Sequence, residues 1–390
     1  MSTTDLRDTE LTFRDTSTGK LLAVRFLFKR LVPLMISERR TEALAKLTLK
    51  LPFGKQLVRH IGPFPHFCGG TSIEDCGPTV RQLARRGVRS ILDYSAEGLA
   101  TEQGFDASRD EVLRTIEFAR HSKDVPFAVF KVTGVAPKEL LEKVSSGSAL
   151  DAEEQAAYDR VTERVRQICS AAHDAGSRVL IDAEESWIQP AIDALAERMM
   201  EEHNRERAIV YTTAQLYRTD RLDYVRGLLN DRYVVGVKLV RGAYMEAERE
   251  RAAALGLPSP IHPTKEATDE AFDAAVDFCL DHLDRFALLA GTHNEASVAR
   301  LLEELDRRGL DPQDPRIECT QLLGMSDNLS VAVAAHGCNA SKYVPYGPLP
   351  TAIPYLIRRA RENSSMEGQT SRELDLINAE LARRRGAGKR

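Results

Sequence analysis

Ionisable side chains stand at or just after the ends of several short apolar runs in this sequence. Lys131 and Lys238 are placed in this way, as are Arg241 and His293, whereas Asp182 is the carboxylate at an equivalent position. Groups that can carry positive charge would outnumber this carboxylate if the runs came together. Such a cluster favours an anionic ligand, for example a phosphate, a pyrophosphate or a carboxylate.

A second group of charges lies near the carboxyl end of the chain. Arg358 and Arg359 are adjacent, and Glu362 follows at a spacing that allows contact with both on a helix. A planar guanidinium held by a carboxylate can bind a second carboxylate through two parallel hydrogen bonds. The pair therefore indicates a carboxylate clamp, with a solvated basic helix face as the alternative.

The apolar runs that carry the first group are spaced like the strands of an alternating α/β protein. Eight strand candidates cover residues 88–94, 127–133, 178–183, 208–213, 234–240, 286–291, 316–321 and 342–345. Helical patterns separate them over residues 110–122, 151–175, 189–204, 220–230, 265–284, 294–308 and 326–336, and a last one covers 349–363. Asn294 and Gly309 fit the N-cap and the C′ position of one of these helices.

This alternation predicts a (β/α)₈ barrel of the TIM type, in which function gathers at the carboxyl ends of the strands. A doubly wound open sheet is the rival fold. Such a sheet usually carries a glycine-rich nucleotide fingerprint in its first βα turn, and the sequence contains neither that fingerprint nor a P-loop. The barrel is therefore preferred.

Composition excludes several other classes of protein. The chain has 390 residues, 43% of them hydrophobic, and a formal net charge of -4, which removes the basic footprint of a nucleic-acid-binding protein. Its six cysteines are scattered, without the spacing of a zinc site or the density of a disulfide framework. We therefore expect reduced thiols and no metal.

We expect an N-terminal helical arm over residues 1–70, a catalytic barrel over 71–370, and a C-terminal helix with a basic tail over 371–390, the last residues from 383 being disordered. The most apolar stretch, 21–36, contains Arg25, Lys29, Arg30 and Pro33 and is shorter than a membrane span. It is interpreted either as a helix packed on the main domain or as a basic, apolar arm on an anionic membrane surface. Acidic residues near the start argue against a secretory signal or a transit peptide. We therefore expect a cytoplasmic protein, with a peripheral position on the inner membrane face left open.

Several motifs resemble those of the proline dehydrogenase family. They are GTSIEDC at 70–76, FKVT at 130–133, IDAEES at 181–186, KLVRGAYM at 238–245, GTHN at 291–294, QLLGMSD at 321–327, KYVPYGP at 342–348 and YLIRRARENSS at 355–365. The resemblance implies a distorted barrel that holds FAD without a separate dinucleotide-binding domain. It implies oxidation of L-proline to Δ1-pyrroline-5-carboxylate, the first step of proline catabolism to glutamate. Hydride would pass from the ring carbon next to nitrogen to flavin N5, and electrons would then pass to a quinone.

The resemblance also assigns roles to residues. It implies catalytic roles for Asp182 and Lys238. Substrate-binding residues would be Lys131, Tyr244, Leu322, Tyr343, Arg358, Arg359 and Glu362. Cofactor-binding residues would be Gln215, Lys238, Val240, Arg241, Gly242, Thr292, His293 and Asn294. At its length, the chain is expected to perform the first step alone and to hand its product to a separate pyrroline-5-carboxylate dehydrogenase.

Two positions bear on the chemistry within that family. Many bacterial members have Arg where this chain has Lys238, which keeps a cation but loses the guanidinium fork. Relatives that prefer hydroxyproline replace the ring-packing Tyr with a smaller residue, so Tyr343 favours proline. Hydroxyproline oxidation stays an alternative.

Three further alternatives belong to other classes. Lys238 could form a Schiff base in a cofactor-free lyase. Asp182, Glu184 and Glu185 could bind a metal ion together with His293. The barrel could also bind small carboxylates without catalysis.

Overall fold

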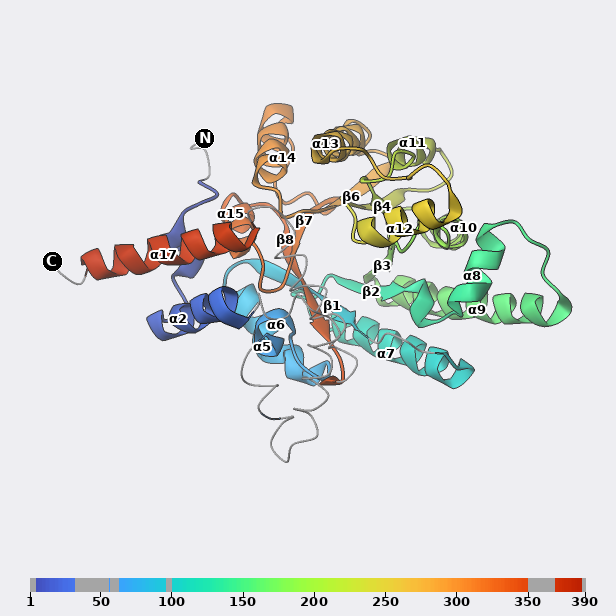
Figure 1. Cartoon of the computed structure of the whole chain (residues 1–390), viewed down its shortest axis with the longest axis horizontal. Coiled ribbons are helices and arrows are strands. Elements are labelled where there is room, and N and C mark those ends of the chain that lie inside the picture. Colours follow the sequence, from blue (N-terminus) through green and yellow to red (C-terminus); the bar gives the residue numbers. More distant parts are fainter. Residues whose placement is uncertain (1–4, 32–55, 57–62, 96–99, 350–368, 388–390) are drawn as a thin grey trace.

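The computed structural model describes residues 5–31, 56, 63–95, 100–349 and 369–387. Eight parallel strands close into a barrel in the order β1 to β8, which confirms the predicted α/β barrel (Figure 1). The strands are β1 Val88–Tyr94, β2 Phe127–Lys131, β3 Arg178–Asp182, β4 Val210–Gln215, β5 Val235–Val240, β6 Phe286–Gly291, β7 Ile317–Leu322 and β8 Ala340–Tyr346.

The barrel is filled from the alternate residues of its strands, since successive side chains of a strand point to opposite faces. Ile91, Phe127, Leu180 and Leu289 belong to the cluster that also contains Tyr343. A larger apolar cluster lies between the strands and the outer helices. In the strand register Lys131 pairs with Asp182 and Leu322 pairs with Tyr343. Neighbouring strands therefore bring these candidate residues to matching levels.

Helices follow the strands as the alternation predicts. The helices that surround the barrel are α6 Gly77–Ala84, α7 Glu102–Arg120, α8 Lys138–Ser145, α9 Ala152–Ala175, α10 Gln189–His203, α11 Arg221–Gly227, α12 Met245–Leu255, α13 Lys265–Asp281, α14 Glu295–Arg308 and α15 Asp327–Ala335; two 3₁₀ turns cover Glu74–Cys76 and Val132–Gly134. The caps of α14 are confirmed: the Asn294 side chain accepts hydrogen bonds from two backbone N–H groups, and Gly309 has a φ of 64°.

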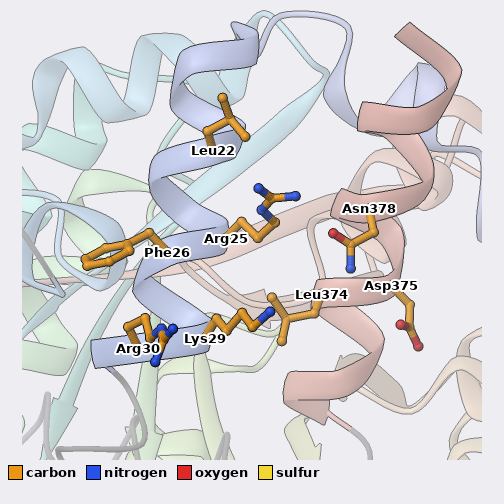
Figure 2. Close-up of a pocket in the computed structure, with 8 residues that line it drawn as sticks. All are labelled: Leu22, Arg25, Phe26, Lys29, Arg30, Leu374, Asp375 and Asn378. Atoms are coloured by element: carbon orange, nitrogen blue, oxygen red, sulfur yellow. The ribbon is translucent and has the colours of Figure 1, made fainter. Parts of the chain in front are cut away.

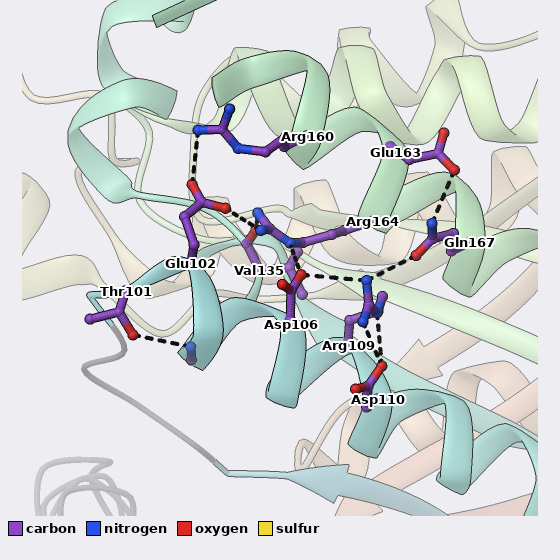
Figure 3. A network of polar contacts seen from close by, with 11 residues as sticks. Thr101, Glu102, Asp106, Arg109, Asp110, Val135, Arg160, Glu163, Arg164 and Gln167 are labelled. Atoms are coloured by element: carbon purple, nitrogen blue, oxygen red, sulfur yellow. Dashed lines mark hydrogen bonds and ion pairs between the residues drawn. The ribbon is translucent and has the colours of Figure 1, made fainter. Parts of the chain in front are cut away.

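Helix α7 begins earlier than the predicted start at residue 110. Thr101 caps it by accepting a hydrogen bond from the backbone of Gly104. Its first turns are tied to α9, because the Arg164 guanidinium binds Glu102 and also donates to Asp106 at 2.7 Å (Figure 3). These contacts between helices distant in sequence stabilise two turns in which the sequence shows little apolar periodicity.

Strand β4 lies two residues further along than the predicted run, from Val210 to Gln215. The buried Asn204 side chain binds the backbone where this strand begins. Its oxygen accepts from the N–H groups of Ile209 and Val210, and its amide donates to the Val210 carbonyl. These hydrogen bonds fix the start of the strand at Val210, and the strand ends at Gln215.

The two terminal segments meet on one side of the barrel (Figure 1). They contain α1 Thr9–Phe13, α2 Thr18–Phe26 with a π-helical turn Leu27–Leu31, α5 Phe64–Phe67 and α17 Gln369–Ala387. Leu21, Phe28, Phe67 and Ile377 are buried together in a second apolar cluster. Part of the apolar stretch 21–36 is thus a packed helix, and its residues 32–36 lie outside the described residues.

The predicted disorder from residue 383 is wrong for residues 383–387, which belong to α17. Arg383 and Arg384 both pair with Glu380 one turn earlier. Arg384 also donates to the backbone carbonyls of Phe13 and Thr16. The basic residues of this segment therefore bind the N-terminal segment. Among the described residues, no helix is long and apolar enough to cross a membrane.

Candidate active site

A three-residue cluster occupies the carboxyl end of the barrel. The Lys238 Nζ on β5 donates to Asp182 Oδ1 on β3 at 2.5 Å and to the Tyr343 hydroxyl on β8 at 2.7 Å. The same hydroxyl lies 3.3 Å from Asp182 Oδ1. Sequence analysis assigned all three residues to the site, and the structure brings them together across the barrel.

The cluster is withdrawn from water, which strengthens its electrostatics. The Lys238 side chain is 6% exposed and that of Asp182 15%. The ammonium also lies 4.6 Å from the centre of the Tyr343 ring. Burial, with Asp182 adding to it, raises the pKa of Tyr343 well above its ordinary value. Tyr343 is therefore a neutral phenol that both accepts and donates a hydrogen bond.

Lys131 is the last residue of β2 and lies beside this cluster. Glu184 is the carboxylate near Lys131. Glu184 is buried and accepts hydrogen bonds from the N–H and the hydroxyl of Thr133. Burial raises the pKa of Glu184, whereas Lys131 and Thr133 act in the opposite direction. Glu185 instead pairs with Lys138. The carboxylates of the metal alternative thus have separate partners, and in the part of the chain that the structure describes no three His, Cys, Asp or Glu side chains form a metal site.

Gln215 joins two loops at the mouth. Its amide donates to the Glu184 carbonyl at 2.7 Å, and its oxygen accepts from the backbone N–H of Ala243 at 3.1 Å. Gly242, in the same loop after β5, has a φ of 142°, and a Cβ there would lie 2.4 Å from the Tyr217 ring. The loop that leads from Val240 to the half-buried Tyr244 is therefore held close to β4.

Arg241 binds groups from several elements. It donates to Asp269 on α13 at 2.5 Å, to the Thr292 hydroxyl at 2.6 Å and to the Ser297 hydroxyl at 2.8 Å. The Thr292 hydroxyl also accepts from the backbone of Asn294. We expected positive charges to outnumber negative ones at the barrel mouth, and this is wrong for two of the cations. Arg241 is paired with Asp269, and Lys238 is paired with Asp182.

His293 lies between the loops that follow β6 and β7. Its Nδ1 is 3.0 Å from the Ser326 hydroxyl, and its Nε2 is 3.4 Å from the backbone N–H of Leu322. The oxygen of Asn294 is occupied by capping α14. The predicted cofactor residues 292–294 thus join strand β6 to its helix and to the next loop.

The comparisons with known proteins agree on one family. A family model described as proline dehydrogenase matches residues 76–372. The chain belongs to the proline dehydrogenase family. It is 34% identical over 367 residues to the carbapenem antibiotics biosynthesis protein CarD of Pectobacterium carotovorum, covering 92% of this chain and 94% of that protein. It is 32% identical to the mitochondrial proline dehydrogenase 1 of Arabidopsis thaliana, covering 83% and 74%.

Solved structures show the same fold. Proline utilization A from Bdellovibrio bacteriovorus, inactivated by N-propargylglycine, matches with a TM-score of 0.72 at 16% identity and covers 92% of this chain. A Bradyrhizobium japonicum proline utilization A variant matches with a TM-score of 0.68 at 20% identity and covers 97%. The chain spans only 41% and 45% of these solved chains.

The proline dehydrogenase family is generally FAD-dependent, and the donor set at the barrel mouth fits a flavin in its chemistry. A flavin ring needs hydrogen-bonding partners along its edge, and its reduced form is stabilised by a nearby cation. Lys238 supplies a cation, while Gln215 and His293 supply amide and imidazole groups. The bare backbone at Gly242 is already used by the Tyr217 ring, so this glycine shapes the loop.

Three of the predicted substrate-binding residues lie outside the described part of the chain. They are Arg358, Arg359 and Glu362, and the predicted helix from 349 to 363 lies there too, apart from residue 349. Asp269 was missed, because it stands inside a helix. The buried Gln321 opens the QLLGMSD motif near the end of an apolar strand, but it was given no role in the site. It lies within β7, donates to the Thr292 carbonyl and accepts from Ser330.

Proposed function

We propose that this chain oxidises L-proline to Δ1-pyrroline-5-carboxylate with FAD bound at the carboxyl end of the barrel. The observation that supports this best is the buried Lys238–Asp182–Tyr343 cluster in a proline dehydrogenase fold. Bound FAD would supply the hydride acceptor.

The side chains at the barrel mouth bind and orient the substrate. Lys131 binds the proline carboxylate by charge, and Arg358 and Arg359 are assigned the same role from their motif. Tyr343 packs against the proline ring, and Leu322 lines the same pocket. Clamping the carboxylate orients one C–H bond, which lowers the entropy cost of reaction.

Asp182 and Tyr343 act on Lys238. Both hold its Nζ by hydrogen bonds, so the ammonium has a fixed position at the mouth. A preorganised cation stabilises negative charge that develops during hydride transfer. An ammonium held in this way has no lone pair for attack on a carbonyl, so the geometry favours this role over Schiff-base formation.

The test is a product assay with the FAD-loaded protein and an artificial electron acceptor. L-Proline should yield pyrroline-5-carboxylate, and hydroxyproline should react more slowly, by about tenfold or more, because the Tyr343 ring crowds the ring hydroxyl. Tyr343→Ser should narrow that difference. Faster turnover of hydroxyproline by the unchanged protein would favour the alternative substrate, and no turnover of either would favour a binding barrel.

We further propose that the electrons pass to a membrane quinone and that α2 with its π-helical turn meets an anionic membrane surface. This segment, residues 18–31, contains Lys20, Arg25, Lys29 and Arg30 but no acidic residue. A basic segment with exposed apolar side chains is typical of peripheral membrane contact.

Figure 2 shows the groove between α2 and α17 that carries this surface. Leu22 and Phe26 are 40% and 58% exposed, although Leu21 and Phe28 are buried against the protein. Lys29 and Arg30 line the same groove. The segment therefore has one face packed inward and one basic, apolar face directed outward.

Binding to vesicles tests this surface. Each basic residue near an anionic surface contributes ~1 kcal/mol, so the double variant Lys29→Gln/Arg30→Gln should bind phosphatidylglycerol vesicles about 30-fold more weakly. Arg198→Gln/Arg226→Gln is a matched control, because both arginines are about half exposed on α10 and α11, away from α2. Equal loss in the two variants, or equal binding to neutral phosphatidylcholine vesicles, would contradict the proposal.

A further inference from the structure

The C-terminal helix α17 contacts two loops of the active site through adjacent residues. The Glu373 carboxylate accepts a hydrogen bond from the backbone N–H of Ser326 at 2.6 Å. The Arg372 guanidinium donates to the His293 carbonyl at 2.9 Å. Ser326 follows β7 and His293 follows β6, so a single turn of α17 binds the ends of two neighbouring strands.

Ser326 has an unusual backbone conformation. Its φ of 50° and ψ of 46° make it the only non-glycine residue with a positive φ among the residues that the structure describes. This left-handed conformation is unfavourable for a residue with a Cβ and persists where surrounding contacts enforce it. Glu373 supplies such a contact, because it binds the N–H of that residue.

The conformation of Ser326 bears directly on His293. The Ser326 hydroxyl lies 3.0 Å from His293 Nδ1, while the other ring nitrogen, Nε2, faces the backbone N–H of Leu322. Contacts therefore run from Glu373 through Ser326 to the imidazole, and Arg372 holds the carbonyl of the same histidine. Both the ring and the backbone of His293 depend on α17.

We propose that Glu373 is a positioning residue that, through Ser326, sets the orientation of the His293 ring for binding FAD. The proposal rests on the proposed binding of FAD at the barrel mouth. It makes α17 part of the functional site, although the helix lies outside the barrel.

The surroundings of Glu373 support a specific role. The residue is 7% exposed, and burial raises its pKa to about 7, with the nearby Asp327 acting in the same direction. The Ser326 N–H and the cations Lys342 and Arg372 act oppositely. A carboxyl group kept in such a place is costly unless its hydrogen bond serves the structure around it.

The test compares variants of Glu373 with variants of Glu380 on the same helix. Glu380 is also buried, but it pairs with Arg383 and Arg384, away from the site. Glu373→Ala should raise the dissociation constant for FAD, measured by titrating apoprotein, about tenfold because the buried Ser326 N–H loses its acceptor. Glu373→Gln keeps an acceptor oxygen and should stay within about twofold of the unchanged protein. Glu380→Ala should lower the melting temperature without weakening FAD binding.

A second readout does not need FAD. In the apoprotein, NMR signals of the His293 ring should shift in Glu373→Ala and stay in place in Glu380→Ala. If Glu373→Ala does not fold, Ser326→Gly removes the hydroxyl while suiting the left-handed backbone, and it should give the same two effects.

Unchanged FAD affinity and unchanged His293 signals in Glu373→Ala would overturn the proposal, as would equal loss of affinity in Glu380→Ala. If the unchanged protein bound no FAD, the proposed function would fail. The NMR comparison would then still decide whether Glu373 orients His293.

Discussion

Replacing Lys238 with methionine should lower kcat/KM for proline by about 10²–10³-fold, the range found when one preorganised group that stabilises developing charge is removed. Methionine keeps much of the side-chain volume but cannot donate to Asp182 or to the Tyr343 hydroxyl. Fold stability should fall as well, by about 3 kcal/mol, because Asp182 would remain in the barrel without its partner. Steady-state kinetics and denaturant unfolding measure the two effects separately.

A second substitution separates charge pairing from catalysis. Lys238→Met/Asp182→Leu removes both charges and should recover most of the lost stability, since an apolar pair can replace a buried ion pair at little cost. Activity should stay lost, because the cation is still missing. Recovery of activity together with stability would show that Lys238 serves only the fold.

The opposite end of the barrel offers a matched control. Arg89 on β1 pairs with Glu318 on β7, whose side chain is 2% exposed. Arg89→Met breaks an ion pair in the same barrel at the amino-terminal ends of its strands. Residues at that end of a barrel contribute to stability and not to catalysis. It should destabilise the protein comparably and leave kcat/KM nearly unchanged once the protein is folded. An equal loss of activity would contradict a special role for Lys238.

The sequence allowed the barrel to be predicted because each strand is a short apolar run and each run is followed by a helical pattern. Asp182, Lys238 and Tyr343 could be predicted as neighbours because parallel strands of a barrel end at one rim. Their mutual hydrogen bonds depend on side-chain directions across the barrel, which the strand pattern alone does not contain. The family assignment came from the motifs.

Other parts of the site are not local in sequence. Asp269 lies within a helix whose periodicity indicates only packing, yet its carboxylate neutralises Arg241. Glu373 belongs to a charged C-terminal segment whose last residues were predicted to be disordered. These residues reach the site because helices far along the chain fold back onto the strand ends, and such tertiary contacts have no signal in local composition.

The proposed reaction requires L-proline to reduce a flavin bound in this barrel. The visible absorption spectrum of the FAD-loaded protein, recorded without oxygen before and after addition of L-proline, tests it most directly, with the Lys238→Met variant measured alongside. We expect the flavin absorbance of the unchanged protein to bleach almost completely, and that of the variant to bleach far more slowly. A protein that binds FAD but keeps its full absorbance with proline would contradict the proposed reaction, and one that binds no FAD when it is supplied would contradict the proposed cofactor.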